Sequence, residues 1–413
     1  MESTDRPQPS SPARLDEAQA TAARIGERTG MAPPLPRLKR VTAWLAAGQL
    51  DALVVTGPAL VNWITGYSRY YGGPSAAVIS PDGERTLVVV RDETGPAEQL
   101  SSADHVAAYG ERGFGLELRL VRLLLDEVLR VSAVSSASRI GVAGDFGTEL
   151  TAGADAGPGA GADWVRADAE LHLMSLVKDA DEIERIFHSY ELCWLAHAAL
   201  AEGAAAGASE IEMMSAAQAA AQIGHGSPVE FGADVLAGAN TAEVCAPVAV
   251  AGRTRPGPGQ PVIADISVGA DGYWADTCRT YLNGTNSEIE EARGRLVPIL
   301  AGAAAELRTG NTGAAVFGGM RERIAAAWPD GEFPHHGGHG VGLSVFDDPH
   351  VIPSDSQVVQ SWMVMALEPG VYLPGRFGVR RENLFLVTPD GGVELAEAVG
   401  RPLDQRAQSV WGH

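Results

Sequence analysis

The second half of the chain is organised around residues Pro261–Tyr281, which read PVIADISVGADGYWADTCRTY. Apolar residues alternate on both sides of the turn-forming quartet Gly269–Gly272, so the stretch predicts a β-hairpin. Asp265 and Asp276 lie on its two arms. They are directly opposite if the loop is centred on the middle two residues of the quartet, and diagonal neighbours if the last two form a type I′ turn. Both registers place the two side chains on one face, because strand side chains have a period of two.

Two carboxylates on one face of a hairpin repel each other when they are close, and burial raises the cost. A hairpin that presents such a pair needs a shared proton, an arginine partner or bridging divalent cations. The alternative is that both acids are solvated beside the turn. Which of these holds depends on the other acids and bases that the chain brings to the hairpin.

The composition is that of an ordinary soluble globular protein. Of the 413 residues 45% are apolar and 20% are charged, and the length fits two domains. A formal net charge of −21 disfavours nucleic acid and anionic membrane as partners, because both require a basic surface. The first residues lack the apolar core of a secretory signal, and no apolar run is long enough to span a bilayer, so we expect a cytoplasmic protein.

Three cysteines, Cys193, Cys245 and Cys278, are odd in number and do not have a zinc spacing. Neither a disulfide framework nor a cysteine-rich metal site is therefore expected.

Three segments are expected along the chain. Residues 1–34 are rich in Pro, Ser, Thr, Gln and charge and predict a flexible tail, with room for a short helix around Ala13–Arg28. Residues 35–174 alternate apolar strands with helices, which predicts a smaller α/β domain. Residues 175–413 form the second domain, which begins with a helix around Leu176–Arg185 whose first turn carries acids.

The second domain contains further candidate ligands besides the hairpin acids. They lie in a Gly-rich segment and in two strand-like segments, and the full set of four carboxylates and one imidazole is Asp265, Asp276, His339, Glu368 and Glu382. An oxygen-rich set with one nitrogen suits two octahedral or five-coordinate divalent ions, Mn, Co or Fe, better than a tetrahedral structural zinc. Two such ions can hold a bridging hydroxide and polarise a carbonyl, which is what amide hydrolysis demands.

The order of these motifs resembles the creatinase, aminopeptidase P and prolidase branch of metallopeptidase family 24, over residues about 35 to 400. The resemblance is carried by Arg37–Tyr67 in the first domain and, in the second, by Asp265–Thr280, His335–Gly342, Glu368–Tyr372 and Gly378–Glu382. It implies an α+β fold in which a smaller α/β creatinase-like N-terminal domain precedes a C-terminal pita-bread domain.

The resemblance also implies a role for each ligand. Asp265 would bind one ion, Asp276 and Glu382 would bridge both, and His339 would bind the other. Glu368 would be a ligand that also moves the proton of the nucleophilic water. Two divalent ions are thus expected as cofactors, with manganese favoured and cobalt, iron or zinc as alternatives. Arg380, two residues before Glu382, matches a family arginine that braces the carboxylates.

Two positions depart from the family pattern. Cys245 stands where the family usually has a substrate-contacting His, and Phe346 where it usually has a His that donates to the tetrahedral intermediate. The loss of one such donor costs about two to three orders of magnitude in turnover. His335, His336 and His350 are close enough in sequence to supply replacements. We therefore expect three catalytic residues and a set of substrate contacts: Glu368, His335 and His350 are catalytic, and Cys245, Phe346, His336, Tyr372 and Arg380 contact the substrate.

Three functions are compatible with this pattern. The first is a hydrolase resembling Xaa-Pro aminopeptidase or dipeptidase, in which a metal-bound hydroxide attacks an amide carbonyl. The second is an enzyme on the same fold that acts on a non-peptide small molecule. It would hydrolyse a C–N bond, as creatinase and ectoine hydrolase do, or it would act as a lyase. The third is a catalytically silent binding protein, which the five retained ligands disfavour. The resemblance implies a homodimer. We expect the mainly apolar run Leu60–Ile64 to lie at the contact with the neighbouring subunit.

Overall fold

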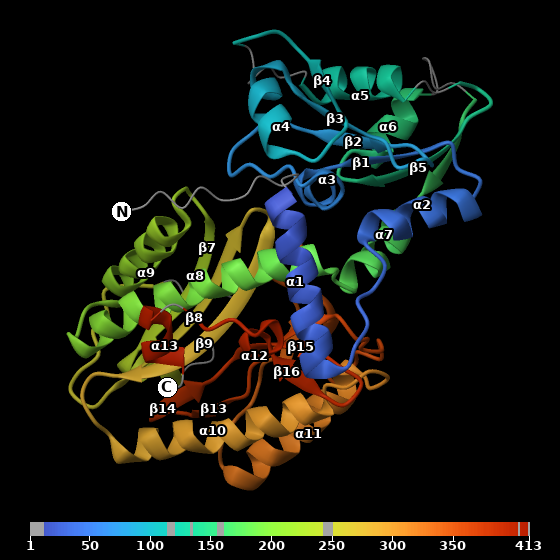
Figure 1. Cartoon of the computed structure of the whole chain (residues 1–413). Coiled ribbons are helices and arrows are strands. Elements are labelled where there is room, and N and C mark those ends of the chain that lie inside the picture. The colour runs from blue at the N-terminus through green and yellow to red at the C-terminus, as the bar shows by residue number, and fades with distance from the viewer. Residues whose placement is uncertain are drawn as a thin grey trace. The chain divides into compact units, whose positions relative to one another are not determined.

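The computed structural model describes residues 12–113, 120–132, 135–154, 161–242, 251–403 and 405–411. The chain forms two units, and each has its own core. The first unit contains residues up to Ala20, Pro34–Ser175 and Asp179–Asp181, and the second contains Thr21–Pro33, Leu176–Lys178 and the chain from Glu182 onward (Figure 1).

The first unit is built on a six-stranded sheet in the order β4-β3-β2-β1-β5-β6. β1 pairs antiparallel with β2 and β2 antiparallel with β3, whereas the β1–β5, β3–β4 and β5–β6 pairs are parallel. The strands are β1 (Ala52–Thr56), β2 (Ala76–Ile79), β3 (Arg85–Val90), β4 (His105–Tyr109), β5 (Arg139–Gly144) and β6 (Asp163–Arg166). Its helices are α2 (Arg37–Ala47), α3 (Pro58–Thr65), α4 (Thr94–Leu100), α5 (Leu120–Val131), α6 (Gly147–Ala154) and α7 (Asp168–Leu176).

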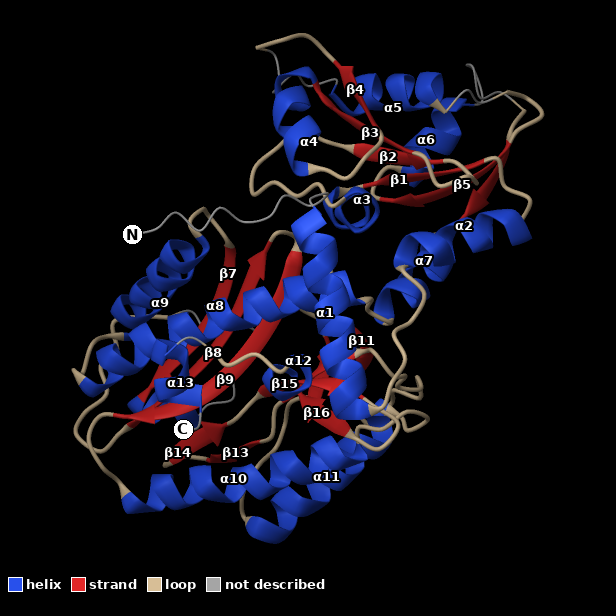
Figure 2. Cartoon of the chain, in the orientation of Figure 1, coloured by secondary structure: helices blue, strands red, loops and turns tan. Residues whose placement is uncertain are grey.

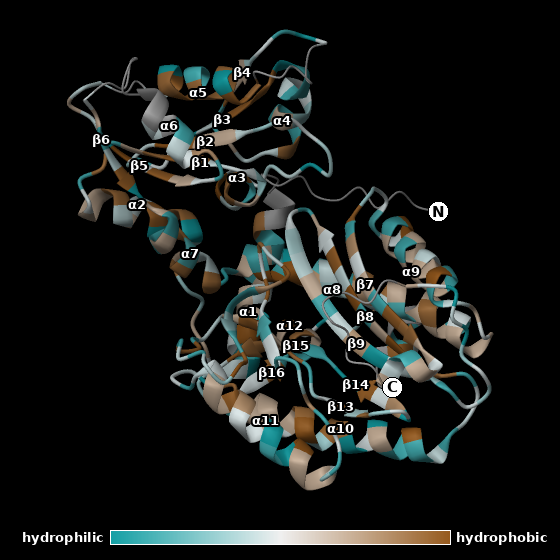
Figure 3. Ribbon diagram, turned by 180° about the vertical axis from the view of Figure 1, so that it is seen from behind, coloured by the Kyte–Doolittle hydropathy of each residue, from teal (hydrophilic) through white to brown (hydrophobic). Residues whose placement is uncertain are grey.

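Helices cover both faces of this sheet. Val54 on β1 packs in one cluster with Leu124 of α5, while the neighbouring Leu53 lies beside Trp44 of α2. A strand buried on both faces reads as a continuous apolar run, which is why β1 has the sequence ALVVT (Figure 3). The segment 151–154, which the sequence assigns to a loop, completes α6.

The apolar run Leu60–Ile64, where the dimer contact is expected, is mostly buried within the first unit. It forms most of α3, and Val61, Trp63 and Ile64 are at most 1% exposed within the first unit. The run is apolar because it packs against the sheet, so its sequence is accounted for without a partner chain.

The second unit contains three sheets. The three-stranded sheet, in the order β7-β8-β9, is made of β7 (Glu230–Ala237), β8 (Pro261–Ala270) and β9 (Tyr273–Leu282). The five-stranded sheet, in the order β11-β10-β12-β15-β16, is made of β10 (Gly338–Gly340), β11 (Asp347–His350), β12 (Val364–Leu367), β15 (Asn383–Val387) and β16 (Gly392–Glu394). A two-stranded sheet joins β13 (Gly370–Leu373) to β14 (Phe377–Arg380).

Two helical layers cover these sheets (Figure 2). The first layer packs against β7–β9 in one apolar cluster and consists of α8 (Ala180–Ala205) and α9 (Glu210–His225). The second packs against β12, β13 and β15 in another cluster and consists of α10 (Ser287–Glu306) and α11 (Gly313–Ala327). The C-terminal part adds α12 (Leu395–Val399) and α13 (Gln405–Trp411). None of the helices in the described part of the chain combines the length and the apolar character needed to cross a membrane.

The N-terminal helix α1 (Pro12–Thr29) extends over the Ala13–Arg28 stretch of the sequence. Ile25 and Met31 are buried in the core of the second unit, and the Arg24 side chain donates to the carbonyl of Val399. Residues 21–33 therefore pack with the second unit, whereas the sequence places them in a flexible tail that ends at residue 34.

The hairpin adopts the second of the two expected registers. Asp271 and Gly272 have φ values of 51° and 76°, as a type I′ turn requires. Asp265 pairs with Cys278 and Ser267 pairs with Asp276. The two acids are therefore diagonal neighbours on one face of the β8–β9 pair.

Candidate metal centre

The five candidate ligands all line one cavity of about 360 Å³ in the second unit. They come from both larger sheets and from the segments between strands. Asp265 lies on β8, Asp276 on β9 and His339 on β10, while Glu368 directly follows β12. The described residues that line the cavity are Gly232, Ala233, Asp234, Asp265, Ser267, Asp276, His335, His336, His339, Phe346, Glu368, Arg380 and Glu382.

Strand pairing explains why Glu368 and Glu382 meet. Leu367 at the end of β12 pairs with Asn383 at the start of β15, so Glu368, which follows β12, meets Glu382, which precedes β15. The amide of Glu382 donates to the carbonyl of Cys278 at 3.0 Å, which attaches this glutamate to the hairpin strand β9. The two halves of the ligand set are thereby joined by main-chain hydrogen bonds.

Three of the ligands form a tight group. One ligand atom each of Asp276, His339 and Glu382 lies within 4.8 Å of the other two. Their residues are only 4%, 1% and 1% exposed. Asp265 and Glu368 line the same cavity: Asp265 forms an ion pair with Arg380, and Glu368 lies beside His335 and His336.

The buried oxygens of the group support cation binding. Among the described side chains, Oδ1 of Asp276 and both Oε atoms of Glu382 are buried and have no hydrogen-bond partner. Buried carboxylate oxygens are almost always paired, and an unpaired one costs about 1–3 kcal/mol or more. Divalent cations coordinated by these oxygens would remove that cost, so the residues present fit a metal centre.

The tautomer of His339 also fits a metal ligand. Its Nδ1–H donates to the carbonyl of Gly340 at 2.9 Å, which leaves the lone pair of Nε2 facing Asp276 at 3.7 Å from Oδ2. Burial lowers the pKa of His339 to about 3, so the ring is neutral at physiological pH. A neutral imidazole with a main-chain acceptor on its second nitrogen is the usual form of a metal-binding histidine.

The carboxylates of the site oppose one another's ionisation. Burial, followed by the charge of neighbouring carboxylates, raises the pKa of Asp276 and Glu382 well above the usual range. Burial also raises the pKa of Glu368. Cations that favour the charged form would lower all three pKa values again, and this is the compensation that the hairpin acids need.

A hydrogen-bond chain lines the wall beside Asp265. Arg380 pairs with Asp265 through one guanidinium nitrogen, and its Nε donates to Oη of Tyr372 at 2.7 Å. Tyr372 in turn donates to Nε2 of His335 at 3.0 Å, and Nδ1 of His335 donates to the carbonyl of His336 at 2.6 Å. This series of hydrogen bonds holds Arg380 against Asp265. The family resemblance implies such a bracing role for this arginine.

The remaining predicted residues separate into two groups. His336 and Phe346 line the cavity, and the Phe346 ring lies edge-on to His339 with 4.8 Å between centroids. His350 pairs with His339 across β10 and β11 but does not line the cavity, and its Nε2 lies 3.8 Å from Oδ1 of Asp348. Cys245 lies outside the described residues.

Two polar residues of the cavity are not among those expected from the sequence. Asp234 on β7 pairs with Asp265, and Ser267 pairs with Asp276. The alternation of Phe231, Ala233 and Val235 with Gly232 and Asp234 predicts a strand and places Asp234 on the face opposite the apolar side chains. That pattern does not reveal which face meets the hairpin.

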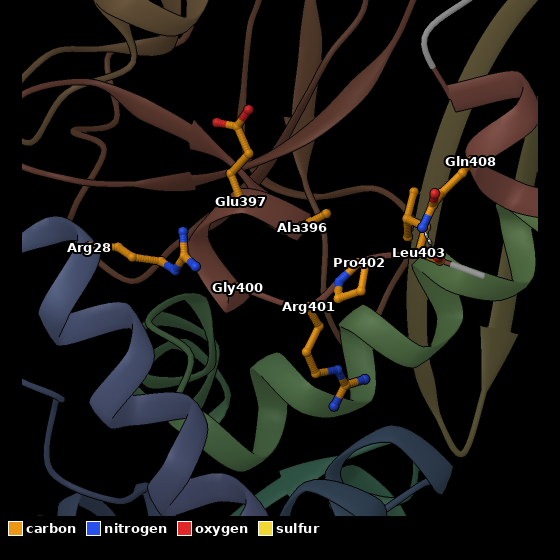
Figure 4. A pocket seen from close by; sticks show the side chains of 8 residues that line it. All are labelled: Arg28, Ala396, Glu397, Gly400, Arg401, Pro402, Leu403 and Gln408. Carbon is orange, nitrogen blue, oxygen red and sulfur yellow. Dashed lines mark hydrogen bonds between the residues drawn. The ribbon is translucent and has the colours of Figure 1, made fainter. Parts of the chain in front are cut away.

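A second cavity in the same unit is larger, about 510 Å³, but has different chemistry. Its charged side chains are Arg28, Glu397 and Arg401, and no imidazole is among the described residues that line it (Figure 4). Arg401 is paired with Glu184 and Glu191. Cavity size alone therefore does not identify the site, whereas the carboxylate and imidazole group does.

Comparison with known proteins gives matches over both units. Residues 184–389 match metallopeptidase family M24, and residues 37–153 match the creatinase/prolidase N-terminal domain. A probable dipeptidase PepE from Mycobacterium tuberculosis is 34% identical over 139 residues, which cover 33% of this chain and only 37% of that relative. An Xaa-Pro dipeptidase from Pyrococcus horikoshii is 24% identical over 371 residues, 87% of this chain and 97% of the relative.

Solved structures agree over most of the chain. The X-Pro aminopeptidase from Thermotoga maritima has a TM-score of 0.71 at 21% identity and covers 89% of this chain and 99% of its own. The prolidase from Pyrococcus furiosus has a TM-score of 0.68 at 22% identity, with 86% and 98% covered. The predicted α+β fold, with a pita-bread domain preceded by a creatinase-like domain, is confirmed. The chain belongs to metallopeptidase family M24, a family of metal-dependent hydrolases, in the branch that includes aminopeptidase P and prolidase.

Proposed function

We propose that this chain is a dinuclear-metal hydrolase that cleaves an amide bond in a short peptide, of the Xaa-Pro aminopeptidase or dipeptidase type. The observation that carries the proposal is the group of unpartnered, buried oxygens of Asp276 and Glu382 beside Nε2 of His339. The Xaa-Pro dipeptidase name of a relative that aligns over 87% of this chain supports the substrate class. The ions would be held by Asp265, Asp276, His339, Glu368 and Glu382.

When bound, the ions would supply Lewis-acid activation of the nucleophilic water and of the scissile carbonyl. The remaining steps fall to side chains of the cavity. Glu368 accepts the proton of the attacking water and passes it to the leaving nitrogen, a transfer that is most efficient when the carboxyl pKa lies near the working pH. The imidazoles of His335 and His336 lie beside this carboxyl group, with their Nδ1 atoms 3.6 and 3.2 Å from its two oxygens.

A second candidate function is favoured by one observation. Phe346 is 56% exposed and presents an apolar ring to the cavity at the position of the expected donor histidine. An apolar wall there suits a compact non-peptide substrate whose carbonyl needs no second donor. Hydrolysis of a C–N bond in such a molecule, or a lyase reaction, would use the same ligands.

A substrate screen on the metal-loaded protein tests both functions. We would measure the metal content of the purified protein by mass spectrometry. The manganese- and cobalt-loaded forms would then be assayed on Xaa-Pro peptides beside amidines, lactams and N-acyl amines. Cleavage of the peptides supports the first function, and cleavage of the small molecules alone supports the second. A protein that holds no divalent ion at micromolar concentrations would contradict both.

Three further features belong to the proposal. We infer manganese as the resident metal from the oxygen-rich ligand set. We infer a homodimer from the family resemblance and a cytoplasmic location from the sequence. Sedimentation that shows a monomer at micromolar concentration would overturn the dimer. Metal analysis of the protein from its native host would decide the metal.

A further inference from the structure

Among the described residues that line the cavity, Asp234 is the one carboxylate that the proposed metal centre does not use. It lies on the central part of β7, and its Cα pairs with that of Asp265. Paired residues of neighbouring strands project their side chains to the same face, so Asp234 lines the cavity beside Asp265.

Asp234 changes the charge balance of the loaded site. The described lining has five carboxylates and one guanidinium, that of Arg380. Two divalent ions would therefore bring the formal charge to zero. Without Asp234 the same site would carry a net positive charge, which would favour substrates with an anionic group near the scissile bond.

The cavity offers no available cation to an anionic substrate. Arg380 is the only basic side chain apart from histidines among the described residues of the lining, and it is engaged by Asp265 and Tyr372. The Nδ1 atom of each of His335, His336 and His339 donates to a main-chain carbonyl.

We propose that Asp234 is a specificity-determining residue that pairs with a cationic nitrogen of the substrate, an ammonium or guanidinium group. The inference rests on the proposed function, since it assigns a substrate class to the same site. The cation can be the free α-ammonium of a peptide or the charged side chain of its first residue. Both present the same chemistry to a carboxylate.

A matched peptide series tests the proposal and separates the two sources. The peptides would differ only in the first residue, arginine or its neutral isostere citrulline, and each would be used with a free or an acetylated amino terminus. The enzymes are wild type, Asp234→Asn and the control Glu230→Gln. The control removes a carboxylate from the same strand β7, and Glu230 does not line the cavity.

The measured quantity is the ratio of kcat/KM for the cationic and the neutral member of each pair. One charge-assisted hydrogen bond corresponds to a preference of about tenfold. We expect the wild type and Glu230→Gln to prefer the cationic member by about this factor and Asp234→Asn to lose the preference. Loss on acetylation assigns the α-ammonium, and loss on exchange to citrulline assigns the side chain. An unchanged ratio in Asp234→Asn, or no preference in the wild type, overturns the proposal.

A binding measurement keeps the test independent of turnover. If no peptide is cleaved, the peptidase function fails and the role of Asp234 is still decided by calorimetry on the metal-loaded protein. Two neutralised analogues of argininamide separate the two cations: citrullinamide lacks the guanidinium charge and Nα-acetylargininamide lacks the α-ammonium. Argininamide should bind the wild type about tenfold more tightly than at least one of these analogues, and this difference should disappear in Asp234→Asn. Equal affinities of all three for the wild type would contradict the proposal.

Discussion

At the scale of single residues, the metal centre depends on oxygens that have no other use in the fold. Oδ1 of Asp276 and the carboxylate of Glu382 are buried without hydrogen-bond partners in the described structure. Such groups are costly unless a cation occupies the site. Substitution of such a residue should therefore remove metal without destabilising the metal-free fold, so metal binding and stability can be measured separately.

Substitution of Glu382 should remove metal without unfolding the chain. We expect Glu382→Gln to lose at least one of two bound ions, as measured by mass spectrometry of the dialysed protein. It should also make the metal-free form more stable than the metal-free wild type in urea, because a carboxylate that repels its neighbours is neutralised. Glu230→Gln provides the control. Full metal content in Glu382→Gln would contradict the assignment.

The apolar ring of Phe346 should limit peptide cleavage. We expect Phe346→His, and more strongly Phe346→His with Cys245→His, to raise hydrolysis of Xaa-Pro peptides, by up to about two orders of magnitude if a lost donor is restored. Steady-state kinetics should show the gain in kcat. Phe346→Leu, which adds no donor, should show no such gain, and an equal gain in Phe346→Leu would attribute the effect to pocket size.

At the scale of elements, one buried ion pair holds the strand that follows Phe346. Nζ of Lys178 lies 3.5 Å from Oδ2 of Asp347, the first residue of β11, and both side chains are at most 8% exposed. The amide of Lys178 also donates to the carbonyl of Trp362. Breaking a buried pair on one side leaves an uncompensated charge.

We expect Lys178→Met to lower the free energy of unfolding by roughly 3 kcal/mol, because it leaves Asp347 charged and buried. Lys178→Met combined with Asp347→Asn should recover much of this loss. Denaturant unfolding of the two single variants and the double variant gives the coupling. Additive losses would show that the two side chains do not interact.

The sequence predicts some elements better than others for physical reasons. The shared face of Asp265 and Asp276 follows from the period of a strand and holds in either register, whereas the register itself depends on the turn. The position of Asp234 beside Asp265 cannot be predicted from the local sequence, because it depends on the pairing of two strands whose residues are more than thirty positions apart. The burial of Trp63 in α3 depends on packing against a sheet, which apolar composition alone does not reveal.

At the scale of the whole molecule, the two units have separate cores and one of them holds the candidate metal centre. Metal should therefore stabilise one unit only. We expect manganese to slow hydrogen exchange in β8, β9 and β12 and to leave β1, β2 and β3 unchanged, as measured by mass spectrometry of peptides. Equal protection of both sheets would show that the units unfold together.

The stability of the metal-free protein should depend on pH with a defined sign. The folded pKa values of Asp276, Glu368 and Glu382 are raised, so over the pH range above the unfolded carboxyl value of about 4 the folded chain binds more protons than the unfolded chain. The free energy of unfolding should fall as pH rises through that range, by up to about 1.4 kcal/mol per pH unit for each group. Urea unfolding after chelation, at pH 5 to 8, measures the slope. Manganese should flatten it, and a slope that is the same with and without metal would contradict this.

The hydrogen bonds beside Asp265 have a single direction, and that polarity limits what His335 can do. Arginine can only donate, so Arg380 donates to Tyr372, Tyr372 donates to His335, and His335 donates to a main-chain carbonyl. Both ring nitrogens of His335 are engaged in these hydrogen bonds, so His335 cannot pass a proton through Tyr372 to Arg380. These contacts favour a positioning role for His335, in which it holds the Tyr372 hydroxyl in place. Of the two histidines that flank Glu368, only His336 has an Nε2 without a partner in this series, and because its Nδ1 donates to the carbonyl of Gly338, that Nε2 can accept from an N–H or O–H group of the substrate.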